Sequence, residues 1–300
     1  MNRFKIAILI SIGLNSGCPI EARATENGFS AYPQGVNTIL NGLVPQPGQT
    51  WIQNYSTYYS AKSFKDSNGN NLIPGFDADL AVESIRVMHT WDWQIGQFSV
   101  SSTIVLPFIH ADIDTAFGGT DNTEIGDVSV GPMYLGWSNP DKTFFAYAGL
   151  EFYLPSKTEV SNKVFSISPN LHLTWLPDPQ LELSGTIGTE FHLKNEDTDY
   201  QSGSLSYMDW AVNYRAFQSL PQLAIGVQGY AAKQFSDDKI GGTTVSDGFR
   251  QQAFAIGPQL VYAIGNRGGG VVLKWQHEFD VENRPEGDKF WFQFQVPIGN

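Results

Sequence analysis

Apolar and polar residues alternate with a period of two along most of the chain. The pattern is clearest near the C-terminal end, where every second position from 290 to 298 is apolar and the positions between them are mostly polar. Successive side chains of a β-strand point to opposite faces of the sheet, so this alternation predicts strands with one apolar face. Each alternating stretch has about 9–11 residues, the length that a tilted strand needs to cross a bilayer.

We predict 12 such strands, and they cover residues 50–61, 79–90, 97–109, 127–137, 142–155, 164–176, 180–193, 204–217, 222–235, 250–263, 270–280 and 288–298. Short connections alternate along the chain with mostly longer ones. The short set is 91–96, 138–141, 177–179, 218–221 and 264–269, and the longer set is 62–78, 110–126, 156–163, 194–203, 236–249 and 281–287. An even strand number, with short periplasmic turns opposite longer outer loops, is typical of bacterial outer-membrane proteins. The predicted fold class is therefore all-β, a transmembrane antiparallel up-and-down β-barrel.

Two stretches depart from simple alternation. Around Glu83 and Ser84 the apolar positions change phase, and we expect a β-bulge there to restore it. The fourth strand is too rich in glycine for its two faces to be assigned. Aromatic residues at the periplasmic strand ends are expected to form an interfacial girdle. These residues are Trp51, Trp137, Trp175 and Tyr262.

The first 24 residues have the pattern of a secretory signal peptide. Arg3 and Lys5 give a positive start, residues 6–14 are apolar, and the sequence ARA at 22–24 is a small-residue cleavage site. The apolar part is too short for a spanning helix, which needs about 20 residues. We expect export to the bacterial outer membrane and cleavage after Ala24, which would leave a mature chain without cysteine because Cys18 lies in this segment.

Residues 25–48 precede the first strand and do not alternate. They are rich in turn formers but carry apolar residues, among them Phe29, Tyr32 and Ile39, that would be awkward free in water. A segment that enters the lumen as a plug and a periplasmic tail are both open interpretations, and we favour partial insertion. The chain then divides into a signal peptide (1–24), an N-terminal plug or periplasmic segment (25–48) and a transmembrane barrel (49–300).

Composition agrees with a barrel and limits the partners. Charged residues make up 16% of the chain, against about a quarter in typical soluble proteins. The mean hydropathy of -0.21 is too polar for a bundle of membrane helices. The formal net charge is -12, and loss of residues 1–24, with three basic and one acidic side chain, would make it -14. This charge balance argues against nucleic acid as a partner, since its binding depends on Lys and Arg against phosphates; outer-membrane lipid is the expected surrounding.

Several segments carry a family resemblance. ENGFSAYPQGVNT and PQPGQT open the mature chain, and EIGDVSVGPMYLGWSNPDKTFFAYAGLEFYLP (124–155), TDYQSG (198–203) and AIGPQLVY (255–262) follow in order. Together they resemble the outer-membrane family named "putative meta-pathway of phenol degradation", over nearly the whole chain. The resemblance implies a barrel linked to the breakdown of aromatic compounds, often described as a channel or transporter for hydrophobic molecules. It brings no catalytic residues with it.

Polar and aromatic residues opposite the lipid-facing positions would line the lumen, because Lys or Arg facing lipid at mid-depth costs about 2–4 kcal/mol. They are either a permeation path or a salt-bridge network that packs the interior. The candidates are Tyr147, Tyr153, Glu182, Glu190, His192, Asp209, Arg215, Tyr230, Lys274, Glu278 and Trp291. The favoured function is passive uptake of small hydrophobic or aromatic solutes. A sealed structural or sensory barrel and, less favoured, a lipid-hydrolysing barrel are the alternatives.

The sequence gives little support for a catalytic site or a metal site. The motifs G-x-S-x-G and H-E-x-x-H are absent from the sequence, and none of the five histidines has a sequence context that pairs it with a serine nucleophile. Acidic residues cluster in two outer loops, at 112–124 and 237–247, but without EF-hand spacing, so we interpret them as solvated surface. We therefore expect no enzyme, no catalytic residue, no metal and no cofactor, and we leave the oligomeric state open.

Overall fold

A computed structural model of the chain describes residues 30–265 and 268–299. The expectations for the signal peptide and for residues 25–29 fall outside these ranges. Within them, no helix is long and apolar enough to cross a membrane.

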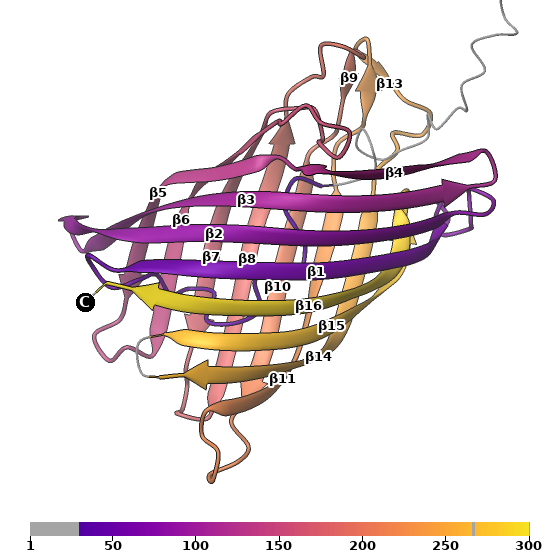
Figure 1. Ribbon diagram of the computed structural model, residues 1–300. Helices are drawn as coiled ribbons and strands as arrows, with labels where there is room; N and C mark the ends of the chain where they lie inside the picture. The colour runs from indigo at the N-terminus through magenta and orange to yellow at the C-terminus, as the bar shows by residue number, and fades with distance from the viewer. Residues whose placement is uncertain (1–29, 266–267, 300) are drawn as a thin grey trace, which may run out of the picture.

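Twelve antiparallel strands close into a barrel. They are β1 (Thr50–Phe64), β2 (Asp77–Ile95), β3 (Phe98–Thr115), β5 (Val128–Ser138), β6 (Phe144–Leu154), β7 (Ser166–Trp175), β8 (Leu181–His192), β10 (Leu205–Tyr214), β11 (Leu223–Gln234), β14 (Gln252–Ile264), β15 (Gly269–Glu282) and β16 (Pro285–Ile298). Each pairs with its neighbour along the chain, and β1 closes the barrel by pairing with β16 from Thr50↔Ile298 to Phe64↔Pro285. In Figure 1 the strands of the near wall run across those of the far wall, because all of them are tilted against the barrel axis. The predicted fold class and strand number are confirmed.

The connections differ in length between the two ends. At one end, near the C-terminus, short turns join β2 to β3, β5 to β6, β7 to β8, β10 to β11 and β14 to β15 (Figure 1). At the other end the predicted loop 110–126 is largely a hairpin of β3 with β4 (Gly118–Ile125). Three short strands, β9 (Tyr200–Gln201), β12 (Lys239–Ile240) and β13 (Thr243–Thr244), form a separate small sheet there. Among the described connections between neighbouring barrel strands at this end, the turn between β15 and β16 is the shortest.

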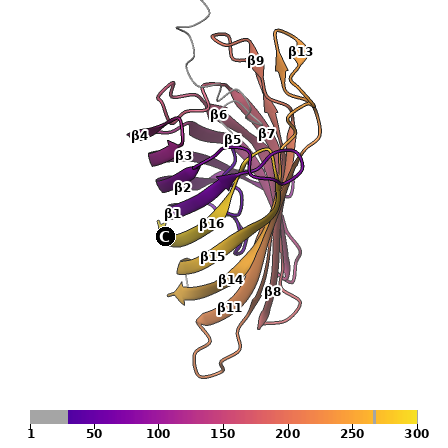
Figure 2. The ribbon, with the colours of Figure 1, turned by 90° about the vertical axis from the view of Figure 1, so that its right-hand side faces the viewer.

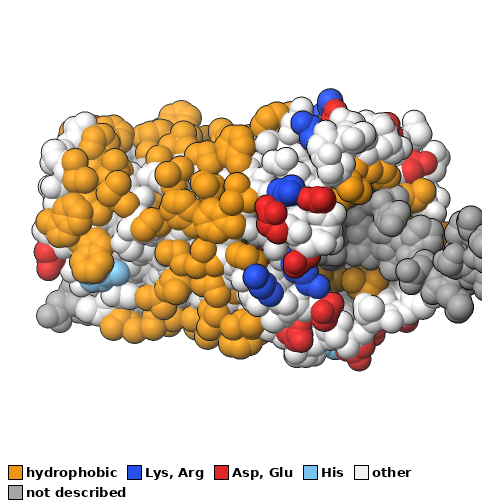
Figure 3. Space-filling model, turned by 90° about the horizontal axis from the view of Figure 1, so that it is seen from above, with side chains coloured by type: hydrophobic (Ala, Val, Ile, Leu, Met, Phe, Trp, Pro, Cys, Tyr) orange, Lys and Arg blue, Asp and Glu red, His pale blue; other side chains and the backbone are white. Residues whose placement is uncertain are grey.

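An apolar belt surrounds the barrel. Figure 3 shows hydrophobic side chains over the middle of the molecule and charged side chains gathered toward one end. Large apolar side chains in the belt remain about half exposed, as Ile187 (51%), Leu273 (50%) and Phe290 (51%) illustrate. In water such a surface would be unstable, whereas lipid chains around a barrel cover it. Turned by 90°, Figure 2 shows β1 to β3 and β14 to β16 on one wall and β8 on the wall opposite.

The bulge expected near Glu83 is wrong. The β1–β2 register runs without interruption from Thr50↔His89 to Ala61↔Ala78, and the irregularity of β2 lies between Thr90 and Gln94. The apolar positions along β2 change phase for another reason. Near the loop end the inward face of β2 is itself apolar, because Ala78 and Leu80 pack on Phe76 and Tyr59 inside the barrel.

Glu83 also departs from the rule that charges face inward. It lies on the outward face of β2 and accepts hydrogen bonds from Asn54 and from the Ser56 hydroxyl (2.6 Å), both on β1. Trp51 departs in the opposite sense. Its place at a strand end predicts it in the girdle, but its side chain is buried and its indole donates to Gln49 (3.2 Å).

Candidate functional site: the lumen and its N-terminal segment

Residues 30–49 form a segment, here called the lumen segment, that runs among the inward-facing side chains. Three buried acids of the wall accept hydrogen bonds from its backbone. Glu190 accepts from the amides of Ala31 (2.9 Å) and Tyr32 (2.8 Å), and Glu182 accepts from the amide of Leu40 (2.6 Å). Chain without regular structure leaves its backbone groups unpaired, and these carboxylates satisfy some of them inside the barrel.

Asp209 on β10, the third of these acids, holds the middle of the lumen segment. Its carboxylate accepts from the Tyr32 hydroxyl (2.6 Å) and from the amides of Gly35 (2.8 Å) and Asn37 (3.0 Å). Burial, together with the charge of Asp209, raises the pKa of Tyr32 well above its ordinary value. The phenol therefore stays protonated and acts as the donor.

Lys274 on β15 supplies the matching positive charge. Its ammonium group donates to the carbonyls of Gly35 (2.5 Å) and Val36 (2.9 Å) and to the hydroxyl of Thr38 (2.8 Å). It also lies 4.8 Å from the centre of the Trp291 ring. Since both Lys274 and Asp209 are buried, each relieves the cost of burying the other's charge. The lumen segment is thus held from two sides through its backbone.

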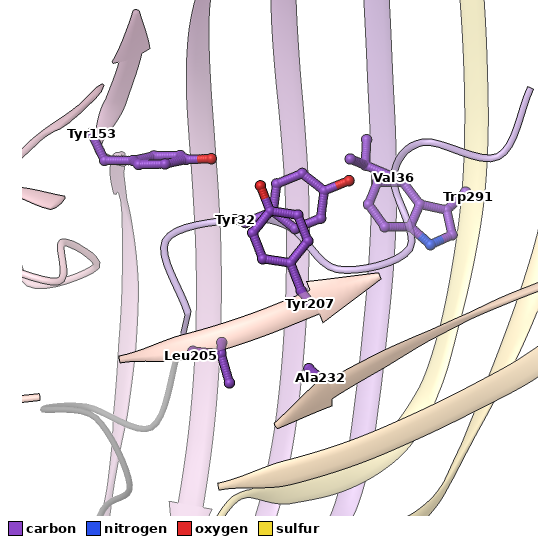
Figure 4. Close-up of a cluster of buried hydrophobic side chains, with 7 residues drawn as sticks. All are labelled: Tyr32, Val36, Tyr153, Leu205, Tyr207, Ala232 and Trp291. Carbon is purple, nitrogen blue, oxygen red and sulfur yellow. The ribbon is translucent and has the colours of Figure 1, made fainter. Parts of the chain in front are cut away.

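Aromatic rings complete the contact. Tyr32 stacks on Tyr207 of β10, with ring centres 3.9 Å apart and planes 10° from parallel. Figure 4 shows these two rings face to face in the lumen, with Tyr153 reaching toward them from one side and Val36 against Trp291 on the other. Ring stacking of this kind adds about 0.5–1.5 kcal/mol to the burial of the rings.

A charged network lies beside the lumen segment near the loop end. Glu278 accepts from the Tyr59 hydroxyl (2.7 Å) and from Tyr230, and it pairs with Arg284 (3.3 Å) and Lys289 (3.7 Å). Arg284 also donates to the side chain of Gln34 (2.7 Å), which links this network to the lumen segment.

The sequence candidates for the lumen are buried side chains of the inner wall, with one exception. The buried ones are Tyr147, Tyr153, Glu182, Glu190, His192, Asp209, Tyr230, Lys274, Glu278 and Trp291. Arg215 is the exception and is not a wall residue. It follows the last residue of β10, is only half-buried, and its guanidinium reaches the carbonyl of Pro179 (3.5 Å) in the adjacent turn. Because β10 ends at Tyr214, the alternation does not extend to it.

Sequence reasoning missed a second group of wall residues, on the side of β2, β5, β6 and β7. Arg86 is buried there, and Tyr134 packs edge-on against Tyr147 with ring centres 5.2 Å apart. Tyr147 in turn stacks on His172 (4.1 Å). The bulge that we expected near Glu83 left the face of Arg86 unassigned, and the glycines of the fourth strand did the same for Tyr134. An unbroken alternation through β2 would have placed Arg86 inside.

One histidine does lie beside a serine. The Ser166 hydroxyl and Nδ1 of His192 are 2.8 Å apart, and Oε2 of Glu190 lies 3.5 Å from Nε2. All three side chains are buried, and Glu190 is already bound by the lumen segment. Nε2 makes no hydrogen bond within the described part of the chain.

Acidic side chains of the outer loops lie against neighbouring residues of the same end of the barrel. Asp238 is fully buried and accepts from Tyr200, from the amide of Gly203 (2.6 Å) and from Gln234 (2.7 Å). Asp112 and Asp121 face each other across the β3–β4 hairpin. In the described ranges no three His, Cys, Asp or Glu side chains are grouped so as to hold a metal ion.

Comparison with known proteins agrees with this architecture. The model of the family "Putative MetA-pathway of phenol degradation" matches residues 61–294. The chain belongs to this family. The match covers β2 to β15 completely, together with most of β16 and the end of β1.

Two solved structures share the fold of this phenol-degradation family member. The COG4313 outer membrane channel from Pseudomonas putida F1 superposes with a TM-score of 0.74 at 12% identity, over 88% of this chain and 100% of that chain. The transport unit of the autotransporter AIDA-I from Escherichia coli gives a TM-score of 0.51 at 10% identity, over 87% of this chain and 94% of that chain. No curated protein matches the chain.

Proposed function

We propose that this family member is an outer-membrane channel for the passive uptake of small hydrophobic or aromatic compounds, exported by a signal peptide that is cleaved after Ala24. The observation that carries the proposal is the uneven attachment of the lumen segment. Its residues 31–41 are bound to one part of the wall, whereas Gly42 donates to Thr174 on β7 (2.9 Å) and Val44 packs on Tyr134 and Tyr147. Hydrogen bonds from residues 31–41 to wall side chains end on β8, β10, β14, β15 and β16 and on the turn before β16. Among the described residues, none of these bonds ends on β1, β2, β3, β5, β6 or β7.

The wall without these bonds suits aromatic solutes. It carries Tyr55, Tyr134 and Tyr147, whose rings offer stacking faces and whose hydroxyls offer hydrogen bonds. A barrel of about eight strands is filled by side chains and one of about sixteen holds an open water channel, so a barrel of twelve strands lies between these two cases. The link of the family to phenol degradation and the shared fold with an outer membrane channel of P. putida point in the same direction.

The alternatives are less well supported. Hydrolysis by Ser166 would need His192 held by a carboxylate hydrogen bond, but among the described residues Nε2 has none and Glu190 binds the lumen segment instead. A sealed barrel differs from a channel only in whether the lumen segment yields to a solute, and that difference can be measured.

The test is solute flux into proteoliposomes that contain the full mature chain. We expect phenol and benzyl alcohol to enter faster than into protein-free liposomes. We also expect flux to rise in Lys274→Met, which loosens the lumen segment. Heat-modifiable gel mobility would show that each barrel is folded. If the wild type and Lys274→Met are both folded and neither shows solute flux, the channel proposal is overturned and the sealed barrel remains.

A further inference from the structure

Arg86 is a buried cation of the inner wall without a carboxylate in contact. Its side chain is 8% exposed, and its Nε donates to the Thr103 hydroxyl on β3 (2.9 Å). Nη2 lies 3.8 Å from the sulfur of Met88. Among the described residues, no Asp or Glu oxygen lies within 4.0 Å of the guanidinium. A buried charge is costly without a partner, so an arginine left in this state is a candidate binding group.

Three other cations of the lumen differ in this respect. Arg284 and Lys289 share the carboxylate of Glu278. The ammonium group of Lys274 donates hydrogen bonds to three oxygen atoms of the lumen segment. The acid on this part of the inner wall is Glu151 of β6. That carboxylate is already occupied by the hydroxyls of Ser129 (2.6 Å) and Tyr134 (3.3 Å).

Aromatic rings surround the guanidinium. Arg86 lies beside Met88, which packs with Tyr134 and Tyr147, and Tyr55 lies on the neighbouring strand β1 close to Arg86 in register. His172, stacked on Tyr147, has its Nε2 buried without a hydrogen bond in the described chain. The hydroxyl of Tyr153, further along β6, is likewise buried without a described partner. Unsatisfied polar atoms of this kind are uncommon in native structures and mark places where a ligand or water completes the hydrogen bonding.

We infer that Arg86 with Tyr55, Tyr134, Tyr147 and His172 forms a binding subsite for aromatic carboxylates, of which benzoate is the simplest. The carboxylate accepts hydrogen bonds from the guanidinium nitrogens that Thr103 leaves free, the geometry for which arginine is best suited. The ring of the solute lies against the tyrosine rings. This inference rests on the proposed function, since it places the subsite on the wall to which residues 31–41 make no side-chain hydrogen bonds. It adds a preference for anionic aromatic solutes over neutral ones.

The test is binding of 4-fluorobenzoate to the full mature chain in nanodiscs, followed by fluorine NMR, with 4-fluorobenzyl alcohol as the neutral probe of the same ring. We expect Arg86→Met to weaken 4-fluorobenzoate binding about tenfold or more, the effect of losing a charge-assisted hydrogen bond in a buried site, and to leave the alcohol unchanged. Lys289→Met is the matched control, because it removes a lumen cation that already has a carboxylate partner, and we expect it to change neither affinity.

Thr103→Val is a second variant, because it removes the hydrogen bond that orients Arg86 and keeps the charge. It should weaken the carboxylate several-fold and spare the alcohol. The inference is overturned if the wild type does not bind 4-fluorobenzoate, or if binding is equally tight in the wild type, Arg86→Met and Thr103→Val. It is also overturned if Lys289→Met loses as much affinity as Arg86→Met.

Phenol flux into proteoliposomes that contain the same protein variants separates the two proposals. If phenol enters but the binding of 4-fluorobenzoate does not depend on Arg86, only the subsite proposal is overturned. Carboxylate binding without flux supports the subsite and overturns the channel.

Discussion

Lys274→Met is the substitution that should release the lumen segment. Methionine keeps the length and apolar character of the side chain, so the packing against Trp291 is largely preserved. The change removes three hydrogen bonds from the ammonium group, to the carbonyls of Gly35 and Val36 and to the hydroxyl of Thr38. It also leaves the buried carboxylate of Asp209 without its nearby positive charge.

The size of the effect follows from these contacts. Hydrogen bonds to a charged group contribute about 1.5–3 kcal/mol each, and breaking a buried charge pair costs about 3–5 kcal/mol. The contributions are not additive, and water that enters the lumen recovers part of the loss. We therefore expect the free energy that holds the lumen segment in place to fall by about 3 kcal/mol. That change raises the fraction of released segment roughly 100-fold.

Thiol reactivity measures this fraction directly. Val36 is buried, and the sole cysteine of the chain, Cys18, lies ahead of the lumen segment. Val36→Cys is nearly isosteric and places a thiol that a maleimide reagent reaches only when the segment leaves its site. In this background, Lys274→Met should react roughly 100-fold faster, whereas Lys233→Met, whose ammonium donates to Gln252 (2.6 Å) on the neighbouring strand, should not change the rate. A rise of less than about threefold in Lys274→Met would refute the role assigned to Lys274.

Three further predictions use the same structure. Asp209→Asn should raise the reactivity of the thiol at position 36 by tenfold or more, because the acceptor of three hydrogen bonds loses its charge; an unchanged rate would contradict this assignment. Phe292→Lys places a charge in the lipid-facing belt and should lower the stability of the barrel in phospholipid vesicles by about 2–4 kcal/mol in urea titrations, whereas Gln293→Lys, on the inward face, should not show this lipid-dependent loss. Gly257→Val should abolish the heat-modifiable folded band, since a Cβ atom there would lie 1.9 Å from the carbonyl oxygen of Trp275; a normal band would mean that β14 and β15 can separate locally.

The alternation of apolar and polar residues was sufficient to predict the barrel and most of the side chains that line its inner wall. The predicted strand ends agree with the structure to within a few residues for most strands, because lipid on one side and a polar lumen on the other impose the same alternation on every strand. Glu190, Asp209 and Lys274 could be assigned to the lumen for this reason. The pattern failed where a face did not have its usual polarity. At Glu83 a charged side chain faces outward beside Ser56, and at Ala78 an apolar one faces inward.

The partners of the wall residues were beyond the sequence. Nothing in the spacing of Glu190 and Asp209 shows that they bind the backbone of Tyr32 and Gly35, more than 150 positions earlier in the chain. Irregular chain has no periodicity, so its path through the lumen is set by hydrogen bonds to strands that only the closed barrel brings together. The same is true of Arg86, because its lack of a carboxylate partner depends on the side chains that neighbouring strands bring around it. The sequence by itself determined the strands, their faces and the membrane belt, because these depend on local alternation. The tertiary structure alone decided which wall holds the lumen segment and which cation is left without an acid, because these depend on contacts between residues far apart in the chain.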